Sequence, residues 1–153
     1  MKVRTLERQI LVEEPLSQVF QFFSQATNLQ ILTPQSLRFE ILSPLPIIMK
    51  SGVRIEYRLR LFGVPFRWEA EITSWEPEER FVDVQRRGPY LLWEHEHRFR
   101  GTSEGTFIED RLRYAVPGGP FEGLISWMFV SRQVTKIFDY RERAIRSFFT
   151  VKS

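Results

Sequence analysis

The chain of 153 residues contains no cysteine. This absence excludes a disulfide framework, a thiolate metal site and a cysteine nucleophile, and it agrees with a reducing compartment. The sequence also lacks a run of about 18 apolar residues, the minimum for a membrane-spanning helix. Residues 1–8 have no apolar core of the kind that marks a secretory signal. We therefore expect a soluble cytoplasmic protein.

The chain has no excess of charge of one sign. It carries 22 Lys and Arg residues against 19 Asp and Glu residues, for a net charge of +3, and the two signs are interspersed. Nucleic-acid binding requires clustered positive charge, so we expect no nucleic-acid partner. A chain of this length forms one domain, residues 1–153, and buries roughly 70% of its unfolded surface.

The hydrophobic pattern predicts a strand at residues 3–12, a short helix after Pro15 and a helical turn at residues 28–32. Further strands are predicted at residues 37–42, 53–62, 66–75, 81–87, 90–100 and 106–115. Short turns with glycine or proline separate them, which is typical of antiparallel hairpins. From residue 121 to residue 149 the spacing becomes helical, with a stripe of Leu124, Trp127, Met128, Ser131, Thr135, Phe138, Ile145 and Phe149. The pattern predicts an α+β fold in which one sheet face packs on this helix.

Both histidines of the chain lie in the strand at residues 90–100. Side chains alternate along a strand, so Trp93, His95, His97 and Phe99 share one face, and the charged residues between them face solvent. A filled core rarely accepts polar groups without partners. The inward histidines therefore indicate a lined cavity.

Hairpin geometry predicts which residues meet these histidines. Across the turn at residues 76–79, Asp83 faces Ile72. Across Gly88 and Pro89, Asp83 becomes the neighbour of His95. The last hairpin makes His95 and His97 neighbours of Ile108, Asp110 and Leu112. We expect Asp83, His95, His97 and Asp110 to form a polar cluster on an aromatic wall.

Three interpretations of this cluster remain open. The carboxylates can simply satisfy buried imidazoles. The cluster can recognise the polar end of an apolar ligand. It can also form a metal or catalytic site, with the four residues as catalytic candidates. The alternating pattern explains the histidine spacing without an ion, so we expect no metal and no cofactor.

The residues that we expect to line the cavity share the inner face of the sheet or of the C-terminal helix. They are Tyr57, Leu59, Phe66, Trp68, Ile72, Phe81, Asp83, Gln85, Trp93, His95, His97, Ile108, Asp110, Leu112, Tyr114, Leu124, Met128, Ser131 and Phe138. The segment 121–129 is apolar almost all round, which favours core packing or a gate that touches a membrane or partner transiently. Residues 139–143 are interpreted as a charged helix face without chemistry.

Several motifs resemble those of the START/SRPBCC superfamily of helix-grip proteins, which includes polyketide cyclases, lipid-transfer domains and the birch pollen allergen. The resemblance covers nearly the whole chain and rests on Asn28-Leu29, Thr33-Pro34, Leu37-x-Phe39, Gly52, Ile55-x-Tyr57-x-Leu59, Gly63-Val64-Pro65, Trp68, Phe81-Val82-Asp83-x-Gln85, Gly88-Pro89-Tyr90, Trp93-x-His95-x-His97-x-Phe99, Asp110 to Pro117 and Ile137-Phe138-Asp139-Tyr140-Arg141. It implies a helix-grip fold, in which a seven-stranded curved antiparallel sheet wraps around a long C-terminal helix, two short helices follow the first strand, and a hydrophobic cavity lies between sheet and helix.

The leading hypothesis is the binding or transport of a hydrophobic or aromatic small molecule, such as a lipid, a polyketide or a quinone-like compound. One alternative is an enzyme of cyclase, aromatase or hydrolase type, with His95 or His97 as base. A second is a protein-interaction module that uses residues 121–129. We expect a monomer or a homodimer.

Overall fold

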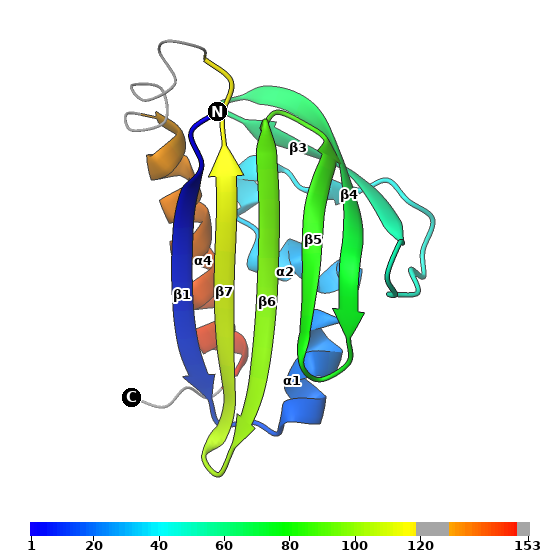
Figure 1. Cartoon of the computed structure of the whole chain (residues 1–153), viewed down its shortest axis with the longest axis vertical. Coiled ribbons are helices and arrows are strands. Elements are labelled where there is room, and N and C mark those ends of the chain that lie inside the picture. The colour runs from blue at the N-terminus through cyan, green and yellow to red at the C-terminus, as the bar shows by residue number, and fades with distance from the viewer. Residues whose placement is uncertain (119–128, 150–153) are drawn as a thin grey trace.

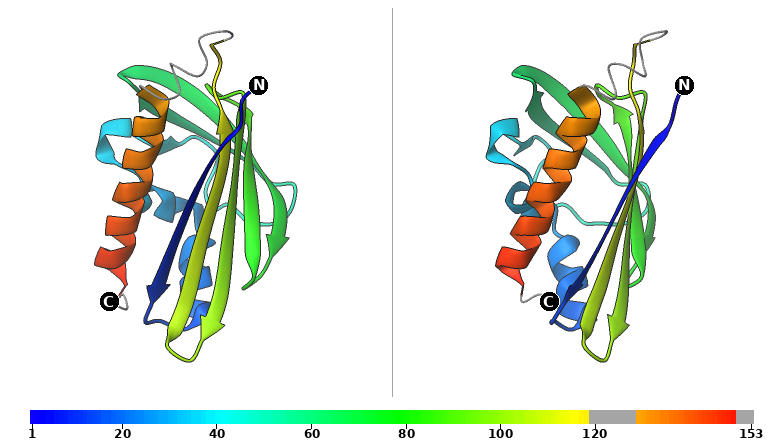
Figure 2. Two further views of the ribbon diagram at one scale, coloured as in Figure 1. Left: turned by 60° about the vertical axis from the view of Figure 1, so that its left-hand side comes forward. Right: turned by 90° about the vertical axis from the view of Figure 1, so that its left-hand side faces the viewer.

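One curved antiparallel sheet forms the body of the computed structural model, which describes residues 1–118 and 129–149. Seven strands follow the order β1-β7-β6-β5-β4-β3-β2. The long helix α4 and the short helices α1 and α2 all lie on one side of this sheet (Figures 1 and 2). The structure therefore has the α+β architecture and the C-terminal helix that the sequence predicts.

The elements follow one another with short connections, apart from the segment between β2 and β3. Their bounds are β1 (Arg4–Val12), α1 (Leu16–Phe23), a 3₁₀ turn (Ala26–Asn28), α2 (Leu29–Leu32), a second 3₁₀ turn (Gln35–Leu37), β2 (Glu40–Ile41), β3 (Arg54–Leu61), β4 (Val64–Glu76), β5 (Arg80–Arg87), β6 (Leu92–Thr102), β7 (Gly105–Ala115) and α4 (Ser131–Phe148). Within the described residues, no helix has both the length and the apolar character needed to cross a membrane.

The strand register confirms the pairings on which the polar cluster depends. Asp83 pairs with Ile72 on one side and with His95 on the other. His97 pairs with Asp110. Because directly opposed residues of an antiparallel pair share a face, all four polar side chains of the cluster point to the concave side of the sheet.

The predicted strand at residues 37–42 is mostly wrong. Leu37 lies in a 3₁₀ turn, and only Glu40 and Ile41 pair with β3. Arg38 follows the 3₁₀ turn and has a left-handed backbone, φ 48° and ψ 48°. This conformation is incompatible with a regular strand. This conformation turns Leu37 back toward the core, where it is buried.

The stripe predicted for the C-terminal helix is correct in part. Val134, Phe138, Arg141 and Ile145 form the buried side of α4, whereas Thr135, which we expected on that side, is exposed. The buried residues are spaced by four, three and four, the helical repeat. A charged residue occupies one of these positions, which obscures the stripe in the sequence. Leu124, Trp127, Met128 and most of the segment 121–129 lie outside the described residues.

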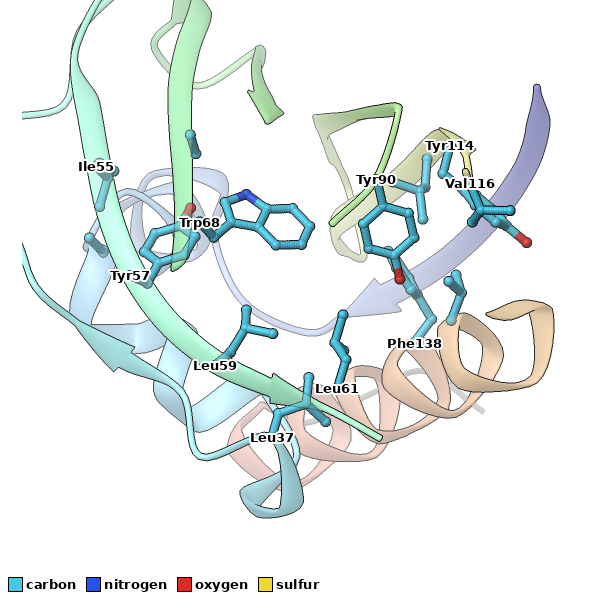
Figure 3. Close-up of a cluster of buried hydrophobic side chains, with 14 residues drawn as sticks. Leu37, Ile55, Tyr57, Leu59, Leu61, Trp68, Tyr90, Tyr114, Val116 and Phe138 are labelled. Carbon is cyan, nitrogen blue, oxygen red and sulfur yellow. The ribbon is translucent and has the colours of Figure 1, made fainter. Parts of the chain in front are cut away.

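Two hydrophobic clusters fill the space between the sheet and the helices. One surrounds Trp68 and Phe138 (Figure 3). The other packs the phenylalanines of α1 against the far end of the sheet, and Phe20 meets Phe99 edge to face at 5.2 Å. Burial of each such ring contributes about 1.5–3 kcal/mol, so α1 closes this end firmly.

Candidate functional site

A cavity of about 130 Å³ lies beside the first hydrophobic cluster. Figure 3 shows Leu37, Leu59 and Leu61 pointing into the same region as Trp68 and Tyr90. The lining combines apolar and ionisable side chains: Leu29, Thr33, Leu37, Phe39, Tyr57, Leu59, Leu61, Trp68, Asp83, Tyr90, Trp93, His95, His97, Ile137 and Arg141. The volume is close to that of an engineered cavity of about 150 Å³ that binds benzene. It is suited to a single ring or a short apolar chain.

Three aromatic side chains form a mutually supporting wall of this cavity. The rings of Trp68 and Trp93 meet at 5.1 Å with their planes at 89°. Tyr90 contacts both, at 5.6 Å from Trp68 and 4.8 Å from Trp93. Such edge-to-face contacts fix the orientation of each ring, so the wall is organised before any ligand binds.

Three members of the polar cluster, Asp83, His95 and His97, line the cavity. His95 Nε2 is 2.9 Å from Asp110 Oδ1, and His97 Nε2 is 2.7 Å from Asp83 Oδ2. The two imidazole rings are tilted against each other, with centroids 3.7 Å apart. His95, His97 and Asp110 are buried, whereas Asp83 is partly exposed toward the cavity.

Arg141 of α4 completes the cluster. Its Nε donates to Asp110 Oδ2 at 3.0 Å, and its Nη2 donates to Asp110 Oδ1 at 3.2 Å. Nη2 also lies 3.4 Å from His97 Nδ1. The expectation that residues 139–143 form a charged outer face is therefore wrong for Arg141, which is 6% exposed. Its position in the buried spacing of α4 is the signal that could have identified it.

Burial and charge together set the ionisation of the cluster. Burial opposes ionisation of Asp110, but the Arg141 guanidinium and the hydrogen bond from His95 hold the pKa of this carboxyl well below its usual range. Burial likewise opposes ionisation of Asp83, yet the hydrogen bond from His97 leaves its pKa lowered. Burial, with the nearby His95 and Arg141, lowers the pKa of His97 to about 4. Both carboxyls are thus ionised at neutral pH and His97 is neutral.

Hydrogen bonding then fixes the tautomers. An ionised carboxylate only accepts, so His97 donates from Nε2 to Asp83 and accepts from Arg141 at Nδ1. His95 donates from Nε2 to Asp110. Its Nδ1 is 4.0 Å from Asp83 Oδ2 and makes no hydrogen bond to the described part of the chain. His95 therefore offers a free ring nitrogen to the cavity.

Hydrogen-bond donors of the aromatic wall are also available. The hydroxyls of Tyr57 and Tyr90 and the indole N–H groups of Trp68 and Trp93 have no hydrogen-bond partner among the described residues. Burial, followed by the charge of Asp83, raises the pKa of Tyr57, which keeps its hydroxyl protonated. All four of these residues line the cavity, as does His95.

The structure brings seven of the residues expected from the sequence to the cavity wall: Tyr57, Leu59, Trp68, Asp83, Trp93, His95 and His97. Asp110 lies behind the histidines and touches the cavity only through them. Leu124 and Met128 fall in the part of the chain that is not described.

The other expected residues do not line the cavity, for three reasons. Some are buried in the core: Ile72 of β4, Leu112 of β7 and Phe138 of α4. Phe81 and Ile108 belong to the second hydrophobic cluster. The rest make other contacts or are partly exposed. Gln85 hydrogen-bonds to the backbone of Tyr90, the Tyr114 hydroxyl donates to Ser131, and Phe66 is only half-buried.

Sequence reasoning missed eight residues of the lining. They are Leu29, Thr33, Leu37, Phe39, Leu61, Tyr90, Ile137 and Arg141. Four of them come from the segment of α2 and the turns before β2, whose packing over the sheet has no periodic signature. Tyr90 lies in the bend before β6, where the alternation of the strand does not yet apply.

Comparison with known proteins places the chain in a family. The model of the family of polyketide cyclase/dehydrase and lipid transport proteins matches residues 12–139. Among curated protein sequences, none matches the chain.

Solved structures share the fold at low sequence identity. The protein TTHA0849 from Thermus thermophilus is 18% identical, with a TM-score of 0.72 and 95% of each chain covered. The Zhui aromatase/cyclase from Streptomyces sp. R1128 is 13% identical, with a TM-score of 0.67, and covers 97% of this chain and 98% of its own. Ginseng major latex-like protein 151 from Panax ginseng is 11% identical, with the same TM-score and the same coverage.

Proposed function

The chain belongs to the polyketide cyclase/dehydrase and lipid transport family of the START/SRPBCC superfamily, and we propose that it binds a small aromatic or short-chain apolar molecule in the cavity. The observation that carries this proposal is the free Nδ1 of His95 at the inner end of an aromatic wall. Ligand sites combine such apolar walls with a few directed polar groups.

The size of the cavity defines the ligand class further. A ring that loses about 100 Å² of apolar surface gains about 2.5 kcal/mol, so burial alone supports only weak binding. A hydroxyl or enol that donates to His95, together with a carbonyl that accepts from Tyr57 or an indole N–H, adds both affinity and orientation. The proposed ligand is therefore an oxygenated single ring or short chain, with any larger part directed toward α2 and β2.

Tryptophan fluorescence provides a direct test. The protein is first analysed by native and denaturing mass spectrometry, and any compound that is released is extracted and titrated back. Binding is expected to change the emission of Trp68 and Trp93, which line the cavity. The variant Trp75→Phe is the matched control, because Trp75 packs against Phe20 in the second cluster. A signal that depends on Trp75 and not on Trp68 would contradict the proposal.

Occlusion of the cavity tests the same proposal without fluorescence. Leu59→Trp places a large ring in the cavity, whereas Ile31→Trp adds the same ring to an exposed position of α2. Calorimetric titration with the extracted compound, or with a panel of phenols if none is retained, should show at least a tenfold loss of affinity for Leu59→Trp alone. Equal affinities in two folded variants would place the ligand elsewhere.

Substitution of the histidines tests whether they recognise the polar end of the ligand. The double substitution His95→Phe and His97→Phe keeps ring-sized side chains but removes the acceptor and the donor. Affinity for an oxygenated ligand should fall, while affinity for a deoxygenated analogue should not. An unchanged affinity for both would remove the histidines from ligand recognition.

A second candidate function is acid–base catalysis of the cyclase, aromatase or hydrolase type on such a ligand. The observation that favours it is the Asp110–His95 pair, because a carboxylate that accepts from one ring nitrogen orients the other as a base. Incubation of the extracted compound with the protein should then change its mass, and His95→Gln should abolish the change while binding remains. Turnover that survives this substitution would exclude His95 as the base.

A further inference from the structure

Three side chains of the cluster hold metal-ligating atoms close together. One carboxylate oxygen of Asp83 and one ring nitrogen each of His95 and His97 lie within 4.8 Å of one another. Asp83 lies on β5 opposite His95, and His97 follows on the same face of β6. Rigid paired strands therefore hold all three, which favours a site of defined geometry.

His95 is already arranged as a metal ligand. It is 7% exposed, and its Nδ1 makes no hydrogen bond to any part of the chain that the structure describes. Its other nitrogen, Nε2, donates to Asp110 Oδ1 at 2.9 Å. A metal-binding histidine almost always donates its second N–H to a carboxylate or carbonyl in this way, which fixes the tautomer and raises the basicity of the ligating nitrogen.

His97 can join the site by a change of tautomer. In the structure its Nε2 donates to Asp83 Oδ2 at 2.7 Å, and its Nδ1 lies 3.5 Å from Asp110 Oδ1. If the proton moves to Nδ1, this nitrogen donates to Asp110 and no longer accepts from Arg141, and Nε2 becomes free to ligate. Asp110 then accepts from both histidines and from Arg141.

The distances fit a small tetrahedral ion. Metal–ligand lengths of about 2.1 Å in a tetrahedral site place neighbouring ligand atoms about 3.4 Å apart. Asp83 Oδ2 is 2.7 Å from His97 Nε2 and 4.0 Å from His95 Nδ1, values that bracket this separation. All three ligand atoms lie within 4.8 Å of one another, so the side chains must rotate to bring every separation to this value. The fourth position faces the cavity, which all three residues line.

Charge and donor type select the ion. Two carboxylates, Asp83 and Asp110, share the single guanidinium of Arg141, so these three side chains have a formal net charge of −1. A buried net charge is costly, and a cation compensates it. Two nitrogens and one oxygen suit zinc and its neighbours in the first transition series, whereas calcium and magnesium prefer oxygen alone.

We propose that Asp83, His95 and His97 bind a divalent transition-metal ion, zinc by donor type, with Asp110 and Arg141 as the supporting shell. The spacing of the histidines along β6 does not require an ion, which is why the sequence alone predicts none. The geometry of the free nitrogen and its carboxylate partner supplies the reason to expect one. The organic ligand proposed above uses the same His95 nitrogen, so an ion and that ligand would compete for it, and each proposal has its own test.

The test uses the full chain, purified without a histidine tag and treated with a chelator. Zn²⁺ is titrated calorimetrically, and Co²⁺ is titrated with visible absorption, whose intensity distinguishes four-coordinate from six-coordinate cobalt. We expect one ion per chain and intense, four-coordinate cobalt absorption. The background is low because the chain has two histidines and no cysteine, so a tight site has few other ligands available.

Substitutions identify the ligands. His95→Gln and Asp83→Asn should each weaken Zn²⁺ binding at least 100-fold, and Asp110→Asn about 10–100-fold through the supporting hydrogen bonds. Asp139→Asn, which changes a half-exposed carboxylate on α4, should leave binding unchanged. Circular dichroism establishes that each variant is folded. Absence of stoichiometric binding to the wild-type chain, or binding that survives in folded His95→Gln and Asp83→Asn proteins, would overturn the proposal.

Discussion

Arg141 of helix α4 and Asp110 of strand β7 form a two-point ion pair inside the protein. Nε to Oδ2 measures 3.0 Å and Nη2 to Oδ1 measures 3.2 Å, and the residues are 6% and 5% exposed. This pair joins the long helix to β7, the strand beside the one that carries the histidines. The helix and the polar cluster are therefore parts of one arrangement.

Removal of the guanidinium should be strongly destabilising. Arg141→Met leaves Asp110 as an uncompensated buried charge, and we expect a loss of about 3–5 kcal/mol in the free energy of unfolding. Arg146→Met is the matched control, because Arg146 is half-exposed and its ion pair with Glu142 contributes well under about 1 kcal/mol. Urea unfolding of both variants measures the difference. Similar small losses in both would show that Arg141 is not needed to hold Asp110 ionised.

The protein should become less stable as the pH is lowered, over a range that the titration of His97 defines. Its pKa is about 4 in the folded protein and about 6.5 in the unfolded chain. Between these values the unfolded state binds more protons, so stability decreases as the pH falls from about 6.5 to about 4, by on the order of 2–3 kcal/mol. The lowered pKa values of Asp83 and Asp110 act below this window.

The contribution of His97 is isolated by substitution. His97→Gln removes the titrating group, and its urea unfolding is compared with that of the wild type from about pH 4 to about pH 7 in the presence of a chelator, so that no bound metal contributes. The wild type should show the steeper decline. Parallel curves would mean that His97 is protonated in the folded state at the same pH as in the unfolded chain.

The hairpin between β6 and β7 depends on a glycine. Gly105 has φ +140°, and a Cβ at this position would lie 2.0 Å from the carbonyl oxygen of Val12. Gly105→Ala should therefore cost roughly 2–4 kcal/mol, because the backbone of β1 must move.

Gly63 is the control for Gly105. It also has a positive φ, +78°, but an added Cβ would meet nothing within 4 Å. Gly63→Ala should cost about 1 kcal/mol, the strain of the backbone alone. Thermal unfolding of the two variants compares them directly. Equal losses would contradict a steric role for the contact between Gly105 and Val12.

The side of α4 that is buried in the structure predicts different losses of stability for substitutions at two neighbouring residues. Val134 is 1% exposed, and Val134→Ala should cost about 2 kcal/mol through lost burial and the cavity that remains. Thr135 is exposed, so Thr135→Ala should change stability by less than about 0.5 kcal/mol. The midpoints of urea unfolding provide the comparison. A larger loss of stability for Thr135→Ala would mean that Thr135 lies on the buried side of the helix, as the sequence predicted.

The amino-acid sequence by itself determined most of the strands, their order and their register. Alternation along residues 90–100 and short turns of defined length oppose Asp83 to His95 and His97 to Asp110, because a slip of one residue would turn every apolar side chain outward. These are local effects of side-chain period and turn chemistry. They are sufficient to predict that the four polar residues cluster on one face.

Only the tertiary structure decided what closes over that cluster. The helical spacing places Arg141 on the same side of α4 as Phe138 and Ile145, but nothing in the sequence identifies Asp110, 31 residues earlier, as the carboxylate that pairs with it. Leu29 and Leu37 likewise reach the cavity through irregular turns without periodicity. The size of the cavity and the free nitrogen of His95 depend on how these segments pack, because contacts between distant elements have no counterpart in local spacing.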